Sequence, residues 1–145
     1  LWFRKDCNGF LPNLYKTKKR IPEWGVRPGL QIGCKVTIRG NEANLILKKL
    51  FSAINNKIDA KKFDDNGNFS FGIKEYLDIP GVEYDPSIDV IGLEVAVTLE
   101  RPGYRIKKRK LQKSKIGSKH LITKEETKEF IQNKYNVNVI EGEEE

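Results

Sequence analysis

The sequence contains no methionine, one histidine and two cysteines, and it has no long apolar run. A helix that spans a bilayer needs about 20 mostly apolar residues, so no membrane span is expected. The first ten residues mix charges into their apolar positions, which argues against a signal peptide and favours the cytoplasm. Since methionine is missing altogether, we expect that residue 1 is not the natural start.

The two cysteines, Cys7 and Cys34, lie far apart and form no CxxC pair. Neither a disulfide framework nor a zinc knuckle is therefore indicated, and we expect two buried, reduced thiols. No GxGxxG and no GxxxxGK[ST] motif occurs, so dinucleotide and P-loop sites are not supported. We expect no cofactor.

Catalytic chemistry has little support in the sequence. His120 has no serine or cysteine nucleophile pattern near it, so it is better explained as a surface or phosphate-facing residue than as a general base. The acids Asp78, Glu83, Asp85 and Asp89 could form a metal site, although their Pro and Gly neighbours are typical of turns. A metal-dependent RNA-processing enzyme is therefore kept as an alternative.

A calcium loop is also rejected. Asp64, Asn66, Asn68 and Glu75 occupy positions that resemble its ligands, but Phe69 stands where the loop requires glycine.

Positive charge is what the sequence has in excess. Lys and Arg number 27 against 20 Asp and Glu, a formal net charge of +7, which favours a polyanionic partner. The cations concentrate in residues 16–20 and 101–119, and the second block contains no acid. Tyr15, Trp24 and Tyr104 are interleaved with them, an arrangement in which bases can stack while phosphates are neutralised. A solvated charged face is the alternative, and nucleic-acid binding is favoured over it.

Apolar periodicity predicts an α+β fold, with a mostly antiparallel sheet and helices packed on one face, in a single domain over 1–145. Residues 1–13 stay unassigned, 101–119 form a basic extension, and 141–145 form an acidic tail. Thr123 and Glu126 form a capping box that begins a helix ending near Tyr135. The other expected elements are strands at 14–21, 30–39, 69–73, 91–99 and 137–140, and a helix at 42–58.

Four stretches resemble the large-subunit ribosomal protein five family, the universal 5S-rRNA binder. They are IGCKVTIRG (32–40), FDDNGNFSFGI (63–73), DIPGVEYDPSI (78–88) and TLERPGYR (98–105), in the family's order. The resemblance covers roughly residues 14–140, and the basic extension is similar to the archaeal branch. No equivalent of the family's first strand is found in residues 1–12.

The resemblance implies a ribosomal-protein-five-like body, without catalysis, in the central protuberance of the large subunit. The implied partners are 5S rRNA, 23S rRNA, the P-site tRNA and neighbouring large-subunit ribosomal proteins. Carried over by position, Trp24 and Thr37 fall at 5S contacts. The tRNA-reaching loop falls at about 22–30, with Arg27, Pro28 and Gly29 at its tip. An RNA-binding protein outside the ribosome is the remaining alternative.

Residues expected to bind rRNA combine the family positions with the basic blocks. They are Lys16, Lys18, Lys19, Arg20, Trp24, Lys35, Thr37, Arg39, Arg101, Tyr104, Arg105, Lys107, Lys108, Arg109, Lys110, Lys113 and Lys115.

Overall fold

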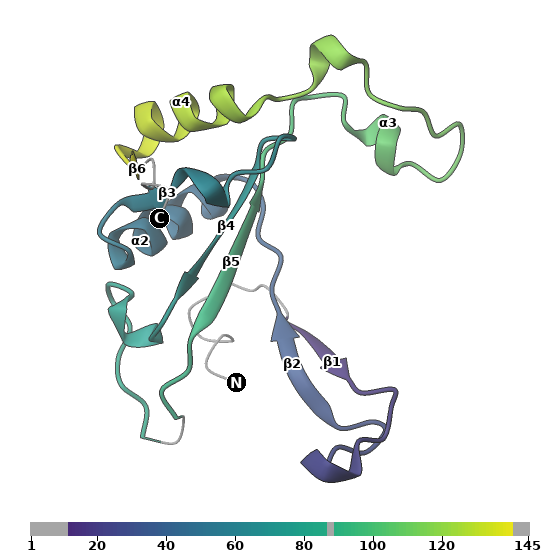
Figure 1. Ribbon diagram of the computed structural model, residues 1–145, viewed down its shortest axis with the longest axis vertical. Coiled ribbons are helices and arrows are strands. Elements are labelled where there is room, and N and C mark those ends of the chain that lie inside the picture. The colour runs from purple at the N-terminus through teal and green to yellow at the C-terminus, as the bar shows by residue number, and fades with distance from the viewer. Residues whose placement is uncertain (1–11, 87–88, 141–145) are drawn as a thin grey trace. The chain divides into compact units, whose positions relative to one another are not determined.

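The computed structural model describes residues 12–86 and 89–140 of the chain (Figure 1). The chain divides into two compact units, Leu1–Leu45 and Ile46–Glu145, and each has its own strands. The single domain expected from the sequence stays a prediction. The acidic tail and most of the unassigned N-terminal segment lie outside the described residues.

The first unit contains the predicted hairpin. Strands β1 (Asn13–Lys16) and β2 (Gln31–Lys35) pair antiparallel, with Leu14 opposite Cys34 and Tyr15 opposite Gly33. Both strands are shorter than predicted, because an irregularity after Tyr15 breaks the ladder. A 3-10 helix, η1 (Pro22–Trp24), forms part of the long loop between the strands.

Cys34 lies exposed on β2, so the prediction of a buried thiol is wrong for this residue. Every residue of β1 and β2 is exposed within the described chain, because a lone two-stranded ribbon has no second layer to cover either face. Cys7 lies outside the described residues.

Helix α2 (Asn41–Ala53) begins in the first unit and continues into the second, and it ends five residues before the predicted boundary. Asn55 and Asn56 follow it with φ angles of 56° and 54°, the left-handed conformation that ends helices. Ile58, which the apolar period predicts to be helical, instead lies in strand β3 (Lys57–Asp59). A short 3-10 turn, η2 (Ala60–Lys62), comes next.

Strands β4 (Asn68–Ile73) and β5 (Leu93–Thr98) form the antiparallel pair that the alternation predicted. Phe69 pairs with Val97 and Phe71 with Val95, so their side chains share one face. The other face is exposed and carries small or polar side chains, such as Ser70 and Ala96. The 3-10 turn η3 (Tyr76–Asp78) follows β4.

The core lies against the apolar face of β4 and β5. Phe51 of α2 is only 1% exposed, and its ring lies 5.5 Å from that of Phe71 and 5.2 Å from that of Tyr135. Helix α4 (Lys124–Tyr135) contributes Ile131 to the same cluster, so the helices share one face as predicted. The predicted capping box of Thr123 and Glu126 is confirmed.

The α+β class is confirmed, although the strands of the described residues form three two-stranded sheets and not one large sheet. Strand β6 (Asn138–Ile140), which was also predicted, pairs in parallel with β3. The basic extension carries only the short helix α3 (Arg105–Lys108) and the 3-10 turn η4 (Ser118–His120).

Candidate nucleic-acid interface

Cationic side chains cover the hairpin of the first unit, residues 13–39, which we call the basic hairpin. This segment holds seven Lys and Arg and a single acid, Glu23. A surface with that ratio attracts polyanions over about 8 Å, the Debye length at physiological salt. All seven cations are exposed: Lys16, Lys18, Lys19, Arg20, Arg27, Lys35 and Arg39.

The loop of the basic hairpin is held by backbone hydrogen bonds, which locate its tip. Ile21 and Val26 exchange two bonds of 2.9 and 3.0 Å, and η1 with Gly25 lies beyond them (Figure 1). Gly25 has a φ of 62°, the left-handed conformation that a tight turn needs. The tip of the hairpin is therefore formed by residues 22–25.

Arg27, Pro28 and Gly29 do not occupy the tip, so that prediction is wrong. They form a second turn on the returning chain, where the Thr17 hydroxyl donates to the Arg27 carbonyl oxygen at 2.6 Å. The Gly29 N–H donates to the Thr17 carbonyl oxygen at 2.9 Å. Both turns carry a Pro and a Gly, and composition alone does not say which of the two lies farther out.

Trp24 presents its ring at the tip. Its side chain is 76% exposed, although its backbone N–H is fixed by a 3.3 Å bond to the Ile21 carbonyl oxygen. A large ring left in water on a fixed turn is typical of a contact residue, because burying it against a partner gains apolar area at little cost in backbone ordering.

The remaining family position of the hairpin is Thr37, which is exposed two residues after β2. Lys35 ends β2, and Arg39 lies between β2 and α2.

The second candidate surface is the basic extension, residues 101–119. Its nine cations have no acid among them in the sequence. Arg101 and Tyr104, at its root, are half-buried, whereas the other predicted contacts are exposed. These are Arg105, Lys107 and Lys108 of α3, followed by Arg109, Lys110, Lys113 and Lys115.

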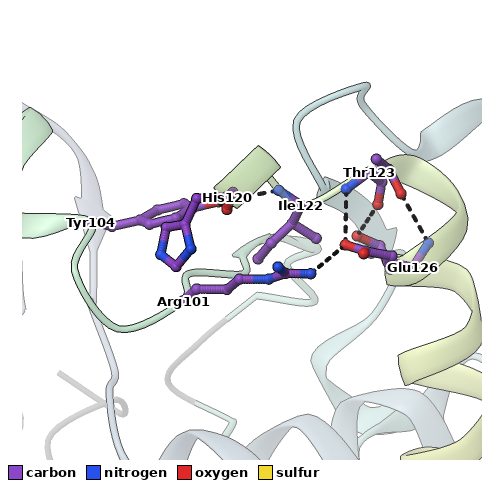
Figure 2. A network of polar contacts seen from close by, with 7 residues as sticks. Arg101, Tyr104, His120, Ile122, Thr123 and Glu126 are labelled. Carbon is purple, nitrogen blue, oxygen red and sulfur yellow. Dashed lines mark hydrogen bonds and ion pairs between the residues drawn. The ribbon is translucent and has the colours of Figure 1, made fainter. Parts of the chain in front are cut away.

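A network of polar contacts holds the root of the extension (Figure 2). The Tyr104 hydroxyl donates to the His120 carbonyl oxygen at 3.0 Å and accepts from the Ile122 N–H at 3.1 Å. The His120 ring nitrogen Nε2 lies 2.9 Å from the Pro102 carbonyl oxygen. A carbonyl oxygen only accepts, so Nε2 donates, and His120 serves as a structural contact between the two ends of the extension.

The same network reaches helix α4 through Arg101. Its guanidinium lies 2.7 Å from the Glu126 carboxylate, which also accepts from the Thr123 N–H at 3.3 Å in the capping box (Figure 2). We call these contacts of Arg101, Tyr104, His120, Ile122, Thr123 and Glu126 the root network. Arg101 and Tyr104, expected from the sequence to touch RNA, thus have defined intramolecular roles.

The sequence signalled only one part of the root network, the capping box. The pairing of Arg101 with Glu126 joins residues 25 positions apart, and no local pattern encodes it. Lys108 is similarly paired with Glu100, just outside the extension.

Two observations bear on the rival functions. Within residues 12–86 and 89–140, no group of three His, Cys, Asp or Glu side chains is placed to hold a metal ion. No helix in the described part of the chain is long and apolar enough to cross a membrane.

Comparison with known proteins points in one direction. Residues 31–130 match the C-terminal part of the ribosomal protein uL5 family. The chain is 50% identical over 137 residues to the "Large ribosomal subunit protein uL5" of Nanoarchaeum equitans, covering 94% of this chain and 80% of that protein. Proteins of the same name in Nitrosopumilus maritimus and Sulfurisphaera tokodaii are 45% and 43% identical, over 93% and 95% of this chain and 78% of each relative.

Proposed function

This chain belongs to the ribosomal protein uL5 family, in its archaeal form, and we propose that it binds 5S rRNA in the central protuberance of the large ribosomal subunit. Membership of the family makes it a structural, RNA-binding constituent of that subunit and not an enzyme. The finer proposal adds contacts with 23S rRNA, the P-site tRNA and neighbouring large-subunit proteins.

The observation that carries the proposal is the basic hairpin. Seven exposed cations face a single acid there, and a tryptophan ring lies exposed at the tip. Cations neutralise phosphates, and exposed rings stack on unpaired bases, so the hairpin offers both of the interactions that folded RNA uses.

The two basic surfaces divide the contacts. On the hairpin, Trp24 and Thr37 touch 5S rRNA, and Lys16, Lys18, Lys19, Arg20, Lys35 and Arg39 meet phosphates. The loop at 22–30 reaches the P-site tRNA, with Trp24 at its outer turn and Arg27, Pro28 and Gly29 at its inner one. The cations of the extension bind rRNA phosphates.

A salt titration tests the proposal. The full chain should bind a 5S rRNA transcript more tightly than a scrambled RNA of equal length, and its affinity should fall steeply as salt rises, because each neutralised phosphate releases counterions. Equal affinity for both RNAs at about 0.15 M salt would count against the proposal.

A regulatory RNA-binding role outside the ribosome makes a different prediction. A protein of that kind would bind RNA yet be absent from large subunits separated on a sucrose gradient. Co-sedimentation of the chain with the large subunit supports the ribosomal proposal, and its absence there supports the rival.

A further inference from the structure

A hollow of about 500 Å³ opens in the basic extension. Its size lies within the range of small-ligand pockets, about 300–1,000 Å³. Its walls come from α3, from the chain after it and from the residue that follows η4. The lining residues are Lys107, Lys113, Ser114, Lys115, Ile116 and Leu121. We call it the extension hollow.

The chain itself holds the walls of the hollow in place. The Ser114 N–H donates to the Ile106 carbonyl oxygen at 3.3 Å and closes the loop between them. The Arg109 side-chain Nε donates to the Gln112 carbonyl oxygen at 2.7 Å and fixes the far end of that loop. The root network fastens both ends of the extension. A preformed cavity binds with a smaller reduction of conformational freedom than a loop that must first become ordered.

The lining combines two chemistries. Lys107, Lys113 and Lys115 bring three ammonium groups, and none of them is paired with an acid among the residues that the structure describes. Ile116 and Leu121 add aliphatic surface between them, and the Ser114 hydroxyl can donate or accept a hydrogen bond. A ligand that fits must carry an anion and, beside it, a flat and poorly hydrated face.

We infer that the extension hollow receives one unstacked nucleotide of rRNA, with its phosphate among the three lysines and its base against Ile116 and Leu121. This inference rests on the proposed function, because it takes rRNA as the ligand. A base inside a duplex is stacked on both faces and cannot enter, so the nucleotide comes from a loop, a bulge or a strand end.

Uncharged substitutions in the hollow test the inference. We would measure the affinity of the full chain for 5S and 23S rRNA transcripts separately, with Ile116→Asn and Leu121→Asn as the test variants. The matched control is Leu111→Asn, a leucine of the same extension that is 78% exposed and does not line the hollow. Thermal unfolding would confirm that each variant is folded.

Both test variants should bind at least one transcript about tenfold more weakly, with an unchanged salt slope because no charge is removed. The control should bind like the parent chain. The exposed double variant Lys113→Gln/Lys115→Gln, which disturbs no core residue, should lower the salt slope by about 2.

Each contrary outcome has its own meaning. If the asparagine variants bind both transcripts as the control does, no base occupies the hollow. If they bind free rRNA normally but are washed from large subunits, an acidic segment of a neighbouring protein fills it, which also overturns the inference. A parent chain without preference for 5S over scrambled RNA defeats the proposed function instead, before any variant is compared.

Discussion

At the scale of single residues, Gly67 shows how closely the turn before β4 approaches the segment that leads into α4. Its φ is 75°, and a Cβ built on it would lie 2.8 Å from both the Ile122 Cγ2 and the Thr127 Oγ1. Thr127 is fully buried and donates to the Thr123 carbonyl oxygen, so it has no room to move away. Only glycine fits here.

Gly67→Ala should therefore lower the free energy of unfolding by about 3 kcal/mol, through left-handed backbone strain and overpacking together. Gly72→Ala is the matched control, since a Cβ at that strand position meets nothing within 4 Å. Urea unfolding of both variants checks this. Equal destabilisation of the two variants would mean that the approach at Gly67 is not tight in solution.

Trp24→Ala should weaken 5S rRNA binding by about 1–3 kcal/mol if its ring stacks on a base. The free energy of unfolding should change by less than about 0.5 kcal/mol, because the ring is exposed and buries little area. Thr37→Ala should show the same separation of binding from stability. Fluorescence anisotropy and thermal melts measure the two quantities. A collapsed melt for Trp24→Ala would show that its ring is a core residue.

At the scale of elements, the root network decides whether the basic extension is ordered against α4. Tyr104→Phe keeps the ring but removes the hydroxyl that accepts from the Ile122 N–H. Ile122 is buried, so its N–H would be left without this partner and without water in its place, at a cost of about 1–2 kcal/mol in unfolding free energy.

Binding to rRNA separates the two possible roles of Tyr104. If the ring stacks on a base, Tyr104→Phe retains its affinity and only its stability falls. If the hydroxyl acts by fixing the extension, affinity falls as well, and amide hydrogen exchange in residues 105–119 speeds up. Unchanged stability together with unchanged exchange would argue against the root network.

The sequence predicted those elements whose signals are local. Strands β4 and β5 alternate strictly, and α4 begins with a capping box, so both were expected within a residue or two. The end of α2 was missed because Ile58 lies four residues after Ile54 and extends the helical period. Two asparagines in left-handed conformation stop the helix before it. An Asn-Asn pair is a signal that could have been given more weight.

Features that depend on distant parts of the chain were not predictable. Strand β3 pairs with β6, about 80 residues later, and neither strand shows a pattern that names its partner. The basic residues of the candidate interface were evident from composition. The extension hollow was not, because it exists only once the Ser114 N–H meets the Ile106 carbonyl oxygen.

At the scale of the whole molecule, the net charge of +7 is unevenly placed along the chain. The acids concentrate outside the basic hairpin and the basic extension, which together hold sixteen cations and one acid by their sequences, seven and one in the first and nine and none in the second. Separation of this kind gives a large electrostatic contribution to RNA affinity even at a modest net charge.

The double variant Lys18→Ala/Lys19→Ala should therefore weaken binding to 5S and to scrambled RNA by similar factors. It should lower the slope of log affinity against log salt by about 1 for each phosphate that is no longer neutralised. Lys48→Ala/Lys49→Ala on α2 is the matched control, with the same charge change outside both basic surfaces. If the control lowers the slope as much, RNA is attracted by net charge alone. A fall for the hairpin pair only locates the phosphate contacts on the hairpin.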